Sequence, residues 1–140
     1  MTQQERLEEL IENFEFLEEW EDRYSFLIDH GRSLPKMNDV LKTEETKIKG
    51  CQSQVWIFLQ AKQIEGKTFV EFLADSDSSL VKGLVAILHS AYFGQTKEAI
   101  LSYDIEGLLF RLGLSDHLSM NRRNGLIGMI QRIKTFAETT

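Results

Sequence analysis

A chain of 140 residues that is 42% hydrophobic and 10% aromatic is long enough to bury one core, and this composition excludes a disordered protein. The formal net charge of -6 and the lack of a basic stripe argue against nucleic acid as a partner, and no basic amphipathic helix points to a membrane surface. The N-terminus shows no secretory signal, and the single cysteine fits a reducing cytosol. We therefore expect one cytoplasmic domain over residues 1–140.

Apolar side chains at helical spacing predict two amphipathic helices in the first thirty residues. A change of phase between Leu17 and Trp20 indicates a bend or break between them. The second helix is expected to end at Gly31 in a left-handed conformation, because Leu34-Pro35 follows and cannot extend a helix. The glutamates of both helices are interpreted as solvated faces, and a docking surface for a basic partner is the alternative.

The middle of the chain predicts a small antiparallel sheet. Residues 36–45 form an irregular connection that leads into a short edge strand, Thr46–Lys49. The strand Val55–Leu59 is apolar on both faces, so we expect it to be central and covered by helices. A polar connection over Gln60–Lys67 predicts a hairpin, with Thr68–Ala74 as the next strand.

The second half of the chain reads as a series of helices. The segment Asp75-Ser76-Asp77-Ser78 is rich in N-cap residues and predicts the start of the strongest helix, which carries an apolar stripe from Leu80 to Tyr92. The last helix presents Leu126 and its apolar neighbours to the core. Further cap or stop candidates are Gly94, Thr96, Asp104, Gly113, Ser119 and Asn121. Helices, a sheet of about three strands and further helices together predict an α+β domain.

The only cysteine, Cys51, stands between a glycine and a run of small polar residues. Gly50 allows a sharp turn and the polar residues keep it at the surface, so we expect Cys51 at a loop tip directly before an anchored strand. Lys47 and Lys49 place positive charge near the sulfur, which favours the thiolate. The alternative is a small buried cysteine with no chemistry.

The segment Gly50-Cys51-Gln52-Ser53-Gln54-Val55-Trp56 resembles the signature of the SufE family, the sulfur acceptors of cysteine desulfurases. The resemblance continues in collinear order over nearly the whole chain. Its further blocks are Asp75-Ser76-Asp77, Val81-Lys82-Gly83-Leu84, His117-Leu118, Arg122 and Gly125-Leu126. The family often has a proline two residues before the arginine, where this chain has Met120. The resemblance implies a SufE/IscU-like α+β fold.

The resemblance also implies a function. Cys51 would accept persulfide sulfur from a pyridoxal-phosphate (PLP)-dependent cysteine desulfurase of the SufS/CsdA-like kind, stimulate that enzyme and relay the sulfur to iron–sulfur cluster assembly on a SufBCD-like scaffold. The chain itself would need no cofactor, because PLP belongs to the desulfurase. A lone thiol suits this role, since a second thiol would discharge the persulfide as a disulfide.

Four companions of Cys51 follow from the matched blocks. Gln52 and Ser53 flank the thiol and are expected to touch the partner. Asp77 is interpreted first as a helix N-cap, with the further hypothesis that it holds the Cys51 loop at rest. Arg122 lies near a helix start, where its charge opposes the helix dipole, so we expect a carboxylate contact, with Asp77 as the guessed partner.

Several alternatives stay open. A CsdE-like acceptor could feed a different sulfur pathway, and a noncatalytic interaction domain could carry a structural cysteine. A thiol hydrolase would need a base beside the sulfur, for which His89 and His117 are the candidates. A metal site is poorly supported, because the three histidines are not at ligand spacing and one cysteine cannot hold a cluster.

Overall fold

Three antiparallel strands form one sheet in the order β1, β2, β3, in a computed structural model that describes residues 2–49 and 53–140. β1 (Val55–Ile64) and β2 (Lys67–Ser76) pair along their whole length, and β3 (Gln95–Thr96) adds a short outer strand to β2. Glu65 and Gly66 make the hairpin turn with φ values of 51° and 80°, the pair of positive angles that a two-residue hairpin favours. The predicted hairpin is confirmed, with longer strands than expected.

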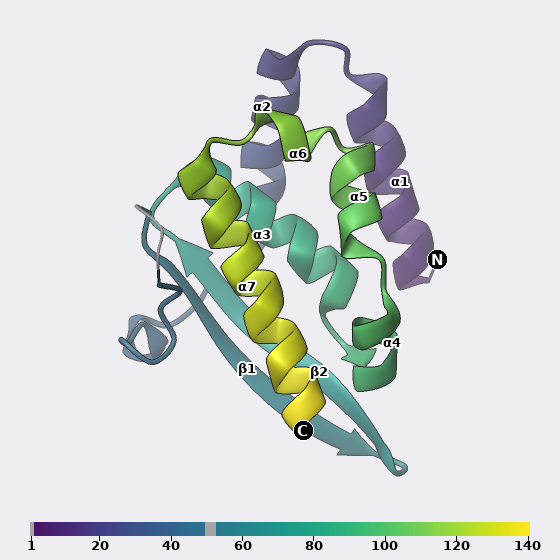
Figure 1. Cartoon of the computed structure of the whole chain (residues 1–140), viewed down its shortest axis with the longest axis vertical. Coiled ribbons are helices and arrows are strands. Elements are labelled where there is room, and N and C mark those ends of the chain that lie inside the picture. The colour runs from purple at the N-terminus through teal and green to yellow at the C-terminus, as the bar shows by residue number, and fades with distance from the viewer. Residues whose placement is uncertain (1, 50–52) are drawn as a thin grey trace.

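α3 (Ser79–Tyr92) packs on the sheet together with α7 (Met120–Thr139), and α1 (Gln3–Phe16) and α2 (Trp20–Gly31) pack against α3 (Figure 1). α1 and α2 precede the sheet, and α3 follows β2. α1 begins with a capping box in which Thr2 and Glu5 satisfy each other's backbone N–H groups. α3 is the most apolar of the three and is buried along most of its length, as its stripe predicted.

The remaining helices close the domain around α3. α4 (Lys97–Ser102) and α5 (Ile105–Arg111) start at the predicted caps, Thr96 and Asp104. The side chains of these two residues accept hydrogen bonds from backbone N–H groups in the first turn of each helix. α6 (Leu114–His117) is one turn of helix between α5 and α7. α7 (Met120–Thr139) starts at Ser119 and crosses the sheet in front of β1 and β2 (Figure 1). A short 3₁₀ helix, η1 (Asp39–Leu41), interrupts the irregular connection before β1. The α+β fold is confirmed.

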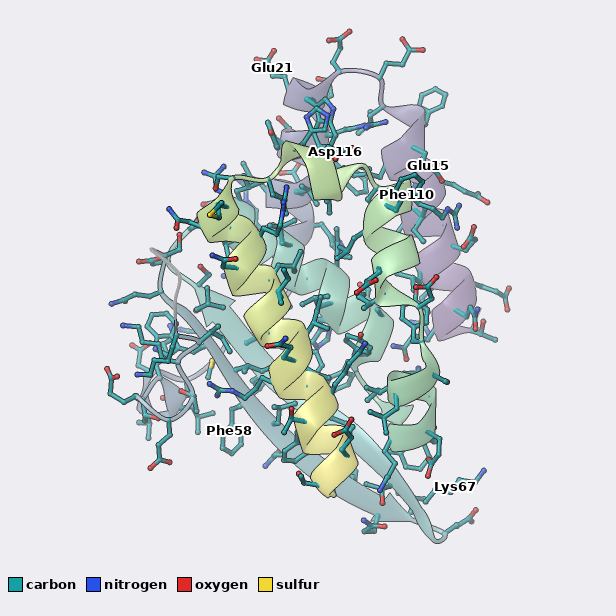
Figure 2. All side chains as sticks on the ribbon, in the orientation of Figure 1. Glu15, Glu21, Phe58, Lys67, Phe110 and Asp116 are labelled. Atoms are coloured by element: carbon teal, nitrogen blue, oxygen red, sulfur yellow. The ribbon has the colours of Figure 1, made fainter. Side chains whose placement is uncertain are left out.

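The expectation that Val55–Leu59 is the central strand is wrong, because β2 occupies that place. Along the outer edge of β1, the described residues contribute only one bridge, between Lys47 and Trp56. Val55 and its alternate neighbours are buried under the helices, whereas Trp56 and Phe58 are half-buried on the opposite face. Figure 2 shows Phe58 projecting away from α7. In the sequence alone, aromatic residues on a half-buried face of a strand look the same as residues on a fully buried face, which explains the error.

α2 and α3 cross so closely that their backbones touch. A Cβ added to Gly83 in α3 would lie 2.2 Å from the carbonyl oxygen of Leu27, and one added to Gly31 would lie 2.8 Å from the Gly83 nitrogen. Gly31 is therefore needed for close approach and does not adopt the left-handed conformation that we expected. α2 ends at Gly31 as predicted, and its C-cap is Arg32, with φ at -67°.

No helix in the described part of the chain is both long enough and apolar enough to cross a bilayer.

We expect Gly83→Ala to lower the free energy of unfolding by about 3 kcal/mol, because the new methyl group meets backbone that cannot move aside. Gly66→Ala is the matched control: its Cβ meets nothing within 4 Å, so only the positive φ costs stability, by about 1 kcal/mol. Urea unfolding of both variants measures the difference. Equal losses would show that the helices can separate at little cost.

Candidate functional site

A cavity of about 240 Å³ lies where the start of β1 meets the first turns of α3 and α7. Cys51 and Gln52 lie outside the described residues, and Ser53 is the first described residue after them. Ser53 and Arg122, both predicted from the matched blocks, line this same cavity although they are far apart in sequence. The rest of the lining comes from Val55, Val81, Ser119, Asn121 and Gly125.

Asp77 holds the residue that follows Ser53. Its carboxylate oxygen Oδ1 accepts a hydrogen bond from the Gln54 backbone N–H at 3.0 Å, and its own N–H donates to the Gln54 carbonyl at 3.2 Å. The N-cap interpretation of Asp77 is wrong: Ser78 caps α3 by accepting from the Val81 N–H. Asp77 stands one residue before the cap and its Oδ1 accepts from Gln54, which leaves support of the Cys51 segment as the hypothesis for Asp77.

Arg122 does not pair with Asp77, because no hydrogen bond or ion pair joins these two described side chains in the structure. Its backbone N–H donates to the Ser119 hydroxyl, and its side chain is exposed at the wall of the cavity. A guanidinium in the first turn of a long helix adds positive charge to an end that is already electropositive. The arrangement therefore favours an anion in the cavity.

A second acidic residue, Asp75, joins three parts of the chain beside this site. Its carboxylate lies 2.8 Å from Lys42 Nζ and 3.4 Å from Lys82 Nζ. Burial acts to raise the pKa of Asp75, but the hydrogen bonds from Lys42 and the Ser76 N–H outweigh it, so this pKa lies below its usual value. Sequence reasoning missed Asp75 because its partners come from a segment of no recognisable pattern and from α3.

One of the two lysines expected to activate Cys51 has another partner. Lys49 Nζ lies 2.6 Å from the exposed carboxylate of Glu44, and this hydrogen bond lowers the pKa of Glu44. Its charge is thus partly compensated before it can act on the thiol. Arg122 and the N-terminal end of α7 are the positive groups at the cavity itself.

Neither candidate base of a thiol hydrolase is presented to the cavity. The ring of His117 stacks on Trp20 at 3.8 Å between centroids. His89 packs against Phe72 and Phe93, in the last turn of α3 and about 15 Å along the helix axis from its first residue. Among the residues that the structure describes, no group of three or more His, Asp or Glu side chains gathers as a metal site would need.

Comparison with known proteins assigns the family. The sequence profile of SufE, described as an Fe-S metabolism associated domain, matches residues 8–137. The chain belongs to the SufE family. An uncharacterized SufE-like protein of Rhizobium meliloti (strain 1021) is 42% identical over 132 residues, 94% of each chain. A second uncharacterized SufE-like protein, from Rhizobium etli, is 37% identical over 132 residues, 94% of this chain and 89% of the relative.

A solved structure supports the α+β fold of the chain. The solution structure of a hypothetical protein from Thermus thermophilus superposes with a TM-score of 0.72, covering 95% of this chain and 93% of the other. At 21% sequence identity this likeness speaks for the fold alone. Membership of the SufE family associates the chain with iron–sulfur metabolism.

Two histidines of this SufE domain, His30 of α2 and His89 of α3, line one surface depression that is separate from the cavity. His30 Nε2 lies 3.3 Å from the Ser90 hydroxyl, and His89 Nε2 is buried with no hydrogen-bond partner among the residues that the structure describes. Burial lowers the pKa of both imidazoles, and for His89 the nearby His30 lowers it further. Arg6 lines the same surface depression, so a proton on either imidazole would place a second positive charge close to the Arg6 guanidinium.

We expect the free energy of unfolding to fall as the pH drops below about 6.5. In that range His30 and His89 bind protons more readily in the unfolded chain than in the folded protein, where their pKa values are lowered. The loss ends below the depressed pKa values of the folded state. Asp75 contributes in a lower range, since its stabilisation is lost only below the usual carboxyl pKa. Urea unfolding at several pH values measures the slope. His89→Leu should flatten it, whereas a slope equal to that of wild type would contradict the assignment.

Proposed function

We propose that this chain accepts persulfide sulfur on Cys51 from a PLP-dependent cysteine desulfurase, stimulates that enzyme and passes the sulfur to the iron–sulfur cluster assembly machinery. The observation that carries the proposal is the cavity beside the Cys51 segment, in which Ser53 and Arg122 meet. Family membership supplies the link to iron–sulfur metabolism. The donor would be a SufS/CsdA-like desulfurase and the recipient a SufBCD-like scaffold complex, both in the cytoplasm.

The electrostatics of the cavity suit a sulfur anion. α7 is 20 residues long, has no acidic residue in its first turn and contributes Asn121 and Arg122 to the wall. Positive groups and helix N-termini lower the pKa of a nearby thiol, and a persulfide anion gains from the same field. The apolar side chains of Val55 and Val81 complete the wall. Such a lining would limit the access of polar reductants to a bound sulfane sulfur.

The transfer is an exchange between sulfur atoms. The Cys51 thiolate attacks the terminal sulfur of the donor persulfide, R–S–SH, and forms a new S–S bond. The donor's own S–S bond breaks, so Cys51 becomes Cys–S–SH and the donor leaves as the thiolate R–S⁻. Charge and atoms balance, and no external oxidant or reductant is consumed. Removal of the sulfur frees the desulfurase nucleophile, which is why acceptance stimulates turnover if that step is limiting.

Asp77 would act in this scheme by holding the chain on the far side of Cys51. Its two hydrogen bonds to Gln54 fix the residue next to Ser53 against the start of α3. PLP, which releases the sulfur from free cysteine, belongs to the desulfurase in this proposal. The alternative of a CsdE-like acceptor changes only the recipient of the sulfur and leaves these roles in place.

We expect wild-type protein incubated with a cysteine desulfurase and cysteine to gain the mass of one sulfur atom, and the gain to disappear on treatment with a thiol reductant. Cys51→Ser should gain nothing and should not stimulate the desulfurase, because a hydroxyl cannot attack the persulfide at neutral pH. Intact-protein mass spectrometry and cysteine turnover are the measurements. Stimulation by Cys51→Ser equal to that by wild type would exclude the covalent mechanism.

Asp77→Ala should slow sulfur loading of Cys51 and lower the free energy of unfolding by about 1 kcal/mol, because the Gln54 N–H loses its acceptor. Asp77→Asn is the matched variant, since its amide oxygen can still accept that hydrogen bond. Loading followed by mass spectrometry, together with urea unfolding, separates the two. A slow Asp77→Asn variant with unchanged stability would show that the charge of Asp77 matters and the hydrogen bond does not.

A further inference from the structure

The chain that leads into Gly50 is held along the outer edge of β1. The Ile48 N–H donates to the Val55 carbonyl at 2.8 Å, and the Ile57 N–H donates to the Thr46 carbonyl at 2.8 Å. We name residues 45–48 the arm. Because Thr46 and Ile48 direct these groups toward β1, the carbonyl of Lys47 between them faces the other way.

α7 receives that other side of the arm. Arg132 donates from Nη1 to the Glu45 carbonyl at 3.0 Å and from Nη2 to the Lys47 carbonyl at 3.1 Å. One turn earlier, Gly128 leaves room for the arm, since a Cβ there would lie 3.0 Å from Cγ2 of Ile48. The Ile48 side chain is only 3% exposed. Gly128 and Arg132 stand four residues apart on one face of α7, and we name this pair the seat.

The seat uses an arginine in a way that its charge alone does not explain. The chain has 22 acidic residues, and Arg111 forms ion pairs with two of them, Glu8 and Glu15. The hydrogen bonds of Arg132 go instead to two backbone carbonyls. A planar guanidinium can bridge two acceptors at a fixed spacing, whereas the ammonium of lysine is a point charge without such a fork. The geometry thus serves to fix a backbone path.

We propose that the seat sets the place from which the Cys51 segment leaves the domain, and that Arg132 is a positioning residue for sulfur acceptance that acts through the arm. This inference rests on the proposed function of Cys51. The segment is then held by two independent devices: Arg132 fixes the incoming chain to α7, and Asp77 fixes the outgoing chain to the start of α3. Loss of the first device leaves the hydrogen bonds of the second intact.

Two variants release the seat by different means. Arg132→Gln removes the guanidinium fork, and Gly128→Ala pushes Ile48 away while favouring the helix through the higher propensity of alanine. In both, alkylation of Cys51 by iodoacetamide should be about threefold faster than in wild type, because an arm held mainly by its hydrogen bonds to β1 is fixed less firmly. The concentration that half-saturates sulfur transfer from the desulfurase should rise, since docking must now order the arm, while the rate at saturation stays the same.

Arg32→Gln is the matched control, because it removes an exposed arginine whose ion pair with Asp29 lies on α2. Its alkylation rate and half-saturating concentration should equal those of wild type. Thermal melts test whether each variant is folded. If Arg132→Gln does not fold, the alkylation rate and the half-saturating concentration of Gly128→Ala decide the question. Unchanged alkylation and unchanged half-saturation in the folded seat variants would overturn the proposal. If wild-type Cys51 takes no sulfur at all, the proposed function fails, and the alkylation rates still judge the seat.

Discussion

The contact on which this domain depends is the crossing of α2 and α3, where backbone lies against backbone. With no side chain between Gly83 and Leu27, the distance between the two helices is set by main-chain atoms alone. α3 then presents its buried face to the sheet and directs its first turn toward the start of β1. Asp77, directly before that turn, lies opposite Gln54 in the continuation of the β1–β2 ladder. The crossing therefore helps to place the part of the cavity wall that comes from α3, and the sheet places Asp77 beside Gln54.

Around the site, hydrogen bonds and ion pairs join segments that are distant in sequence. Asp75 at the end of β2 holds Lys42 and Lys82, so the irregular connection before β1 is fastened to the sheet and to α3 at one carboxylate. Arg132 fastens the same connection to α7. The positive end of α7 remains at the cavity, where Arg122 adds its charge. An acidic protein thus keeps a local environment that favours an anion.

Local chemistry was enough to predict much of the fold, because a cap, a turn or an apolar stripe acts within a few residues. The caps confirmed in this way are Thr96, Asp104 and Ser119. The errors arose where a distant partner decides the role of a residue. Gly31 could end a helix or admit a close neighbour, and only Gly83 settles which. In the sequence, Asp77 is an ordinary cap candidate, and only the fold shows that its carboxylate accepts a hydrogen bond from Gln54. Likewise, no residue near Arg132 in the sequence distinguishes it from a solvated arginine.

The spacing of the two fixed points limits how far the sulfur can travel. Ile48 is bonded to β1 and Gln54 to Asp77, and Cys51 is three residues from each. Three residues of fully extended chain reach about 10 Å, so while both bonds last the Cα atom of Cys51 stays within that radius of either end. Under the proposed function, a donor whose persulfide lies deeper than this in its own cleft would have to open, or one of the two attachments would have to break. The tether length would then select which enzymes can hand over their sulfur.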